Sequence, residues 1–143
     1  MEHWTKTKGD SGVGFIIADL MSKGIHVALP ISEHLPFDCI AVSPKTSEVV
    51  RISCKYRKAV NGSFCVRYSS CWSDKHGVHT KPQDKSAFDC TAIYCPDSGK
   101  VYYINNNEIE SKSFFLRIVP SKNSQTTGVR LASLYEDANR IFK

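Results

Sequence analysis

The segment from residue 26 to residue 55 places the tightest constraint on how this chain can fold. Apolar runs separated by polar turns predict a short strand that ends at Pro30, a second strand over 37–42 and a third over 49–55. Turn residues lie between the runs, so consecutive strands are expected to be neighbours in one sheet. The segment therefore predicts the centre of a sheet-containing domain.

Three polar residues of this segment are expected to lie close together. Residues two apart in a strand share a face, so Ser53 and Lys55 point the same way, and Asp38 lies at the mouth of the neighbouring strand. A carboxylate that holds Mg²⁺ and a lysine that steadies the attacking water and the phosphate charge are typical of metal-dependent phosphodiester cleavage. The same residues are also consistent with a turn residue and a solvated strand end.

Composition limits the classes of protein that the chain can belong to. The 143 residues predict one domain, 1–143, and 41% hydrophobic with 23% charged residues is typical of a globular protein. No run approaches the roughly 18 apolar residues of a membrane span, and the first residues lack a signal-peptide core, so an intracellular, cytoplasmic protein is expected. The net charge of +5 favours an anionic partner.

The six cysteines are predicted to be reduced. No pair has the two-residue gap of zinc knuckles and ribbons, and Cys39, Cys54 and Cys90 lie in apolar runs, where free cysteine behaves as a small buried hydrophobe. One zinc alternative stays open, in which four side chains from a strand end and the following loop bind the metal. These are Cys65, Cys71, His76 and His79.

The rest of the chain predicts an α+β, or mixed α/β, domain. A helix is expected to begin within 8–12 and end before Gly24, with an apolar stripe of Val13, Ile16, Ile17, Leu20 and Met21. Trp72 to Ser86 is predicted to be a long polar loop. The remaining expected elements are strands over 64–68 and 114–119, a hairpin of 87–94 with 100–104, and a last helix with a stripe of Leu131, Leu134, Tyr135, Ala138, Ile141 and Phe142.

Several landmarks in this order resemble a known family. They are Lys8-Gly9-Asp10-Ser11-Gly12, Leu20 to Gly24, Pro36-Phe37-Asp38, Ile52-Ser53-Cys54-Lys55, the run from Phe88 to Asp97, Tyr102-Tyr103-Ile104, Leu116-Arg117-Ile118 and Ser121-Lys122-Asn123. Over residues 6 to 140 the chain is similar to the small group I intron homing endonucleases of the PD-(D/E)XK superfamily, the type found in cyanobacterial transfer-RNA introns.

The resemblance implies a PD-(D/E)XK core, a mixed sheet with flanking helices, that acts on double-stranded DNA as a dimer or tetramer with Mg²⁺ as cofactor. Asp38 matches the metal-binding aspartate, Lys55 the motif lysine, and the backbone carbonyl of Cys54 a further metal contact. Two positions depart from the pattern: Val13 stands at an expected glutamate, and Ser53 at an expected glutamine or glutamate. A site with these substitutions would hold Mg²⁺ loosely.

Three functional hypotheses follow. The first is a nucleic-acid-binding protein with cleavage lost or weak, which binds DNA or has been recruited to structured RNA or a ribonucleoprotein. The second is an active homing endonuclease in which Asp10, Glu33 or Asp89 substitutes for the missing acid, and the third is a protein-interaction domain. Under the first, the expected phosphate contacts are Arg57, Lys58, Arg67, Lys75, Lys81, Lys85, Lys112, Lys122 and Arg130.

Overall fold

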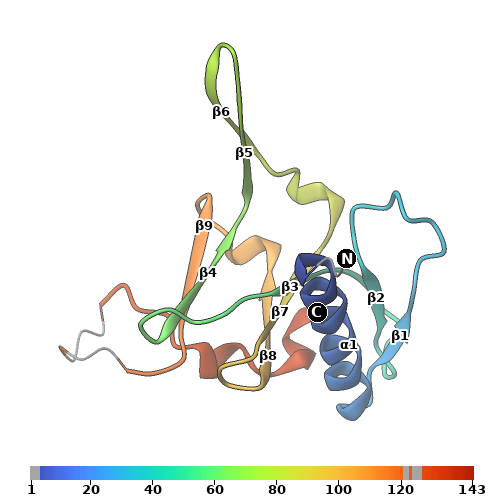
Figure 1. Ribbon diagram of the computed structural model, residues 1–143. Helices are drawn as coiled ribbons and strands as arrows, with labels where there is room; N and C mark the ends of the chain where they lie inside the picture. Colours follow the sequence, from blue (N-terminus) through green and yellow to red (C-terminus); the bar gives the residue numbers. More distant parts are fainter. Residues whose placement is uncertain (1–3, 121–122, 124–126) are drawn as a thin grey trace.

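The computed structural model describes residues 4–120, 123 and 127–143. Its centre is a five-stranded sheet in the order β1-β2-β3-β7-β8, with β3 and β7 parallel and the other neighbours antiparallel (Figure 1). The bounds of these strands are β1 His26–Ala28, β2 Cys39–Val42, β3 Val49–Tyr56, β7 Cys90–Cys95 and β8 Lys100–Asn105. The strands predicted within 26–55 are therefore present, and the predicted α+β class is confirmed.

Two smaller sheets and four short 3-10 helices complete the described chain. β4 (Ser63–Arg67) pairs with β9 (Ser113–Arg117), and β5 (Ser69–Asp74) pairs with β6 (Gly77–Pro82). The 3-10 helices are η1 Lys85–Ala87, η2 Asn106–Glu108, η3 Ala132–Tyr135 and η4 Ala138–Ile141. Within the described ranges, no helix has the length and apolar character needed to cross a bilayer.

Helix α1 (Trp4–Ser22) packs on one face of the central sheet and begins several residues earlier than predicted. Ile16 and Leu20 are fully buried, as the apolar stripe indicated, but Met21 is 62% exposed and lies off the buried face. The helix ends in a Schellman arrangement, in which the N–H of Gly24 donates to Met21 and that of Ile25 donates to Leu20. Gly24 has a φ of 78°, which glycine adopts without steric cost.

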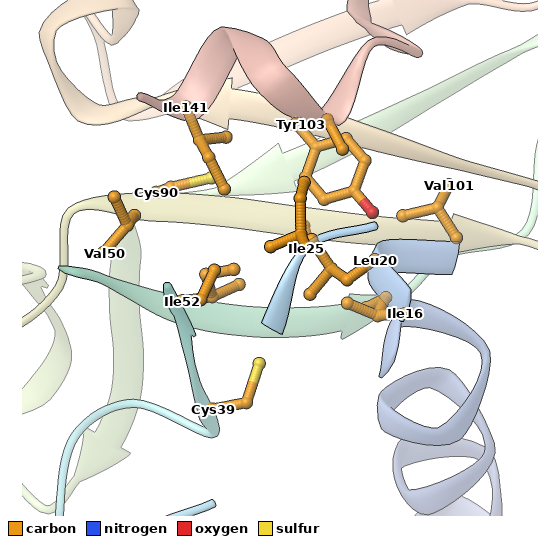
Figure 2. Close-up of a cluster of buried hydrophobic side chains, with 13 residues drawn as sticks. Ile16, Leu20, Ile25, Cys39, Val50, Ile52, Cys90, Val101, Tyr103 and Ile141 are labelled. Carbon is orange, nitrogen blue, oxygen red and sulfur yellow. The ribbon is translucent and has the colours of Figure 1, made fainter. Parts of the chain in front are cut away.

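Apolar side chains cover both faces of β7, so the central sheet is the middle of three layers. On one face, Cys90 packs in a cluster with Ile52, Tyr103 and residues of α1 (Figure 2). Ala92 belongs to the same cluster. On the opposite face, Ile93 packs in a second cluster whose other members include Phe64, Val66, Phe114 and Leu116 of the β4–β9 sheet. A strand that is buried on both faces has a nearly continuous apolar sequence, so this strand was readily predicted.

Two predicted elements are wrong. The segment from Trp72 to Ser86 is not a loop: most of it belongs to the β5–β6 hairpin, called here the ribbon, which projects from the body of the molecule (Figure 1). Every residue from 70 to 78 is exposed, so the sequence has no alternation of apolar residues from which these strands could be predicted. The ribbon turns where the Asp74 carboxylate accepts a hydrogen bond from the N–H of His76 and Gly77 adopts a φ of 118°.

The predicted last helix is replaced by η3 and η4. The side chain of Asp137 accepts a hydrogen bond from the N–H of Asn139 and caps η4, which separates the two short helices. Leu134 is 70% exposed, whereas Ala138 is fully buried. The apolar spacing in this region therefore does not mark one helical face.

Candidate functional site

Asp38 lies beside β3 and completes its hydrogen bonding to β2. The N–H of Asp38 donates to the carbonyl of Ile52 at 2.9 Å. The N–H of Cys54 then donates to Oδ2 of Asp38 at 2.7 Å, so the carboxylate takes the place of the next main-chain acceptor. This hydrogen bond sets the Asp38 carboxylate at the residue next to Lys55 in β3, and the joint role expected for the two side chains stays a prediction.

Lys55 is half-buried, and its surroundings weaken its hold on a proton. Burial of the ammonium group lowers the pKa of Lys55, and the positive charge of Arg57 lowers it further, while Asp38 acts in the opposite direction. A partly desolvated ammonium group attracts a phosphate oxygen more strongly than one in bulk water, because water screens it less. Lys55 is therefore placed to stabilise negative charge beside Asp38.

Ser53 points into the protein and brings no charge to this region. It is 5% exposed and in register with Thr91 of β7. The Tyr68 hydroxyl donates to Oγ1 of Thr91 at 3.0 Å, and burial raises the pKa of Tyr68 to about 12, so Tyr68 is a neutral phenol at pH 7. Hydroxyl groups, not carboxylates, form the polar interior next to Ser53.

Helix α1 approaches β3 most closely at Gly12, and Val13 follows directly. A Cβ on Gly12 would lie 3.2 Å from Cβ of Tyr56, which is tighter than ordinary packing. Its distance to the Lys55 carbonyl oxygen would be 3.5 Å, an ordinary contact. Val13 is half-buried at this crossing. The helix therefore brings an isopropyl group to the level of β3 where the family resemblance implies a carboxylate.

The proposed substitute acids do not complete a metal site in the described parts of the chain. Arg51 engages Asp89 through Nε at 3.1 Å, Nη2 at 3.0 Å and its own N–H at 2.9 Å, and this pairing holds the pKa of Asp89 below its ordinary value. Asp10 on α1 and Glu33 between β1 and β2 are exposed. No group of three or more His, Cys, Asp or Glu side chains that could hold a metal ion occurs among the described residues.

The donor set around β3 does not fit a firmly held Mg²⁺. Such an ion is usually fixed by one or two carboxylates in near-octahedral geometry. Here one oxygen of the Asp38 carboxylate already accepts the Cys54 N–H, and Ser53 offers a buried hydroxyl. The resemblance also implies the backbone carbonyl of Cys54 as a metal contact. Because this carbonyl is neutral, Asp38 would be the sole charged ligand of this set.

The zinc alternative is not supported. Cys71 is in register with Thr80 and Trp72 with His79, so Cys71 and His79 face opposite sides of the ribbon. His79 Nε2 lies 3.0 Å from Oδ1 of Asp74 instead. Cys65 belongs to β4, outside the ribbon, and all six cysteines have free thiols, as predicted.

The basic side chains expected to contact phosphate fall into separate places. Lys75 lies at the tip of the ribbon and Lys81 near its base, and both are exposed. Arg67 ends β4 where the ribbon begins, and Lys112 lies beside it, because the N–H of Tyr68 donates to the Lys112 carbonyl at 2.7 Å. These four residues, Arg67, Lys75, Lys81 and Lys112, form the basic tract of the ribbon and its base.

The other members of the expected set lie elsewhere. Arg57 and Lys58 follow β3, and Nη1 of Arg57 donates to the carbonyl of Tyr56 at 2.9 Å. The Arg130 guanidinium lies 4.4 Å from the ring centroid of Phe114. Lys85 begins η1, and Lys122 lies outside the described residues. The set is therefore not one continuous surface.

Sequence reasoning missed two groups of exposed aromatic side chains. Trp72 stacks on His79 in the ribbon, with ring centroids 5.4 Å apart. Phe15 of α1 stacks on Tyr94 at 4.1 Å and an interplanar angle of 8°, and Trp4, at the beginning of the same helix, is 63% exposed. No alternation in the sequence over 69–74 indicates the first group, and the second depends on the contact of α1 with β7.

Comparisons with known proteins agree with this architecture. The family model described as PD-(D/E)XK endonuclease matches residues 3–138. No curated protein matches the chain. Among solved structures, the bacterial homing endonuclease I-Ssp6803I is similar, with a TM-score of 0.71 and 15% sequence identity over 96% of this chain and 91% of that one. At that identity the likeness concerns the fold.

Proposed function

The chain belongs to the PD-(D/E)XK endonuclease family, and from this premise we propose that it binds double-stranded DNA and that its cleavage activity is weak or lost. The observation that carries the proposal is the donor set at β3, where one of the two Asp38 oxygens is already engaged and Val13 and Ser53 add no charge. Binding needs only shape and positive charge, which the ribbon supplies.

Weak cleavage follows from the electrostatics of phosphodiester hydrolysis. The transition state gains negative charge that metal ions and cations must stabilise. Lys55 provides one cation beside Asp38, and its lowered pKa favours transfer of a proton to a leaving oxygen. The same lysine contacts an intact phosphate equally well, so its retention is consistent with binding alone.

The ribbon suits the major groove of DNA. Its strands are six residues each, about 20 Å long, and a two-stranded ribbon fits a B-form groove about 12 Å wide. Lys75 would enter with the tip, and Arg67 and Lys112 at the base would face phosphates. Double-stranded RNA is less suitable, because its major groove is deep and narrow.

Binding of a labelled duplex, followed by fluorescence anisotropy at several salt concentrations, tests the first half of the proposal. Lys75→Gln with Lys81→Gln is expected to weaken binding and to reduce the slope of log affinity against log salt by about 2. The matched control is Lys45→Gln, an exposed lysine in the turn between β2 and β3. Binding that is unaffected by salt, or a structured RNA that outcompetes the duplex, would contradict the proposal.

Plasmid cleavage with Mg²⁺ or Mn²⁺ tests the second half. The wild-type protein is expected to cut no faster than Asp38→Asn, a variant that keeps an oxygen for the Cys54 N–H and so preserves the β2–β3 contact. Metal-dependent cutting that Asp38→Asn abolishes would favour the alternative, an active Mg²⁺-dependent site-specific homing endonuclease. Cutting gained on Val13→Glu with Ser53→Gln would support the view that these two positions account for the loss.

A further inference from the structure

We propose that the chain has a second nucleic-acid site, which stacks an unpaired base. The site, called here the aromatic groove, is a hollow of about 230 Å³ lined chiefly by Trp4, Lys8, Phe15, Tyr56, Lys58 and Tyr94. It lies between the first half of α1 and the carboxyl ends of β3 and β7. The inference extends the proposed function from duplex DNA to DNA that carries an unpaired segment, and it rests on that function for the class of ligand.

The rings of the groove form a partly built stack with one side open. The inner face of Phe15 lies on Tyr94 at 4.1 Å, and Tyr56 meets Tyr94 at 5.8 Å with an angle of 56°. Phe15 nevertheless remains 51% exposed, so the stack ends in a ring that still contacts solvent. A base placed on Phe15 would continue the stack and remove this apolar surface from water.

Charge at the groove suits a phosphate group. Of the described residues, its lining contains two lysines and no carboxylate, and Nζ of Lys8 lies 4.9 Å from the ring centroid of Trp4. Asp97, which follows the lining residue Pro96, has one oxygen committed to the Ala59 N–H at 2.7 Å. Aromatic rings flanked by cations are the arrangement by which proteins hold single-stranded nucleic acid without reading its sequence.

The size of the groove favours one planar ring system over a folded partner. Pockets for drug-sized ligands have volumes of about 300–1,000 Å³, and stable protein interfaces bury about 1,200–2,000 Å² in total. The groove is smaller than the first range, and Thr7, Ser11 and the two lysines interrupt its apolar surface. A single base with its phosphate matches both its dimensions and its polarity.

The groove is distinct from the ribbon and from the Asp38–Lys55 pair. Tyr56 follows Lys55 in β3, and side chains alternate along a strand, so Tyr56 faces α1 while Lys55 faces the opposite side of the sheet. The ribbon begins beyond β4, after a further turn of the chain. A strand that leaves a duplex near the end of β3 would therefore reach the groove without displacing the ribbon.

Tryptophan fluorescence can report on the two sites separately, because the chain has two tryptophans, Trp4 in the groove and Trp72 in the ribbon. Trp72→Phe leaves Trp4 as the reporter, and Trp4→Phe leaves Trp72. A short oligothymidylate is expected to quench the Trp4 reporter and to leave the Trp72 reporter unchanged. A blunt duplex is expected to quench the Trp72 reporter.

Substitutions test whether stacking causes the response. Phe15→Ala, in the Trp72→Phe background, is expected to weaken oligothymidylate binding about 10-fold, since stacking on one ring is worth roughly 1–3 kcal/mol per base. Met21→Ala, on the same helix but outside the groove, is the control and is expected to change nothing. Because Phe15 packs on Tyr94, Trp4→Ala, which removes a more exposed ring, repeats the test by anisotropy.

The possible results separate this proposal from the preceding one. Duplex binding through Trp72 with a silent Trp4 reporter would overturn the aromatic groove and leave the proposed function intact. Quenching of Trp4 without duplex binding would overturn the proposed function and leave the aromatic groove intact. Self-association that depends on protein concentration and disappears in Phe15→Ala would assign the groove to a contact between copies and would overturn its role in base stacking.

Discussion

The body of the molecule and the ribbon are built on the same local structure but are stabilised differently. In the body, β7 is covered on both faces, and Ile93 is fully buried. In the ribbon, Val78 is 75% exposed, and the two strands are held by their own hydrogen bonds and the stacking of Trp72 on His79. An isolated two-stranded hairpin is marginally stable in water. Burial therefore fixes the body, whereas the shape of the ribbon is left sensitive to a partner.

The contrast also separates the two candidate functional regions. Asp38 and Ser53 lie where strands of the body meet, so changing them alters hydrogen bonds or packing as well as charge. Lys75 and Lys81 extend from the ribbon into solvent, and their substitution changes charge alone. Loss of binding without loss of stability is therefore expected for the ribbon and not for β3.

The largest expected difference is between a buried and an exposed aliphatic residue. Ile93→Ala is expected to lower the free energy of unfolding by about 2–5 kcal/mol, because it leaves a cavity in the buried cluster between β7 and the β4–β9 sheet. Val78→Ala in the ribbon is expected to change it by less than about 0.5 kcal/mol. Urea denaturation measures both, and similar losses for the two variants would remove the distinction between body and ribbon.

A smaller loss is expected when the buried hydroxyl pair of the body is broken. Tyr68→Phe removes the donor to Oγ1 of Thr91 and should cost about 1–3 kcal/mol of unfolding free energy. The double variant with Thr91→Val should cost less than the sum of the single variants, because no buried hydroxyl then lacks a partner. Additive losses in urea denaturation would show that the two hydroxyls do not interact.

A pair of glycines in α1 tests how closely the helix packs on the body. Gly14 has open space around it, so Gly14→Ala is expected to raise the unfolding free energy by about 0.5–1 kcal/mol. Gly12→Ala should lose this gain, because the new methyl group would press on Tyr56. Thermal denaturation of both variants gives the comparison, and equal stabilisation would mean that the helix stands further from β3.

The smallest expected effect concerns the surface of the body, where Arg51 lowers the pKa of Asp89. A carboxylate with a lowered folded-state pKa stabilises the protein above its unfolded pKa of about 4, and the contribution is lost as the pH falls through the folded value. Asp89→Asn should therefore be less stable than wild type at pH 7, by under about 1 kcal/mol since the pair is partly exposed.

Urea midpoints of wild type and Asp89→Asn at pH 7, 5 and 3 would check this prediction. The difference is expected to shrink below pH 4. A difference that stays constant down to pH 3 would mean that the variant acts through the hydrogen bond to the Arg51 N–H, not through the charge.

Those parts of the fold in which apolar spacing reflects burial were predictable. Ile16 and Leu20 marked the buried face of α1, and the β7–β8 hairpin was recognised from its two apolar runs and the turn between them. The ribbon was missed because both of its faces are exposed, so its residues carry no apolar period. The last helix was predicted wrongly because apolar residues such as Leu134 are exposed.

The candidate site likewise has features that could be predicted from the sequence and features that could not. Strand periodicity alone was enough to expect Asp38 near Lys55, because β2 and β3 are joined by a short turn and pair directly. The hydrogen bond of Asp38 to the Cys54 N–H and the pairing of Asp89 with Arg51 were not predictable. The first depends on how the Asp38 carboxylate is oriented beside β3, and the second on residues that become neighbours across 38 residues of chain.

By itself, the sequence determined the strands around β3, the first helix, the positive charge and the absence of two expected acidic or amide side chains. Tertiary structure alone decided which acids stay available, where the basic residues lie, and that Trp4, Phe15, Tyr56 and Tyr94 line one groove. The physical reason is the separation along the chain between the residues that interact. Local patterns follow from the side-chain periods of single helices and strands, whereas a site is set by contacts between segments distant in the chain.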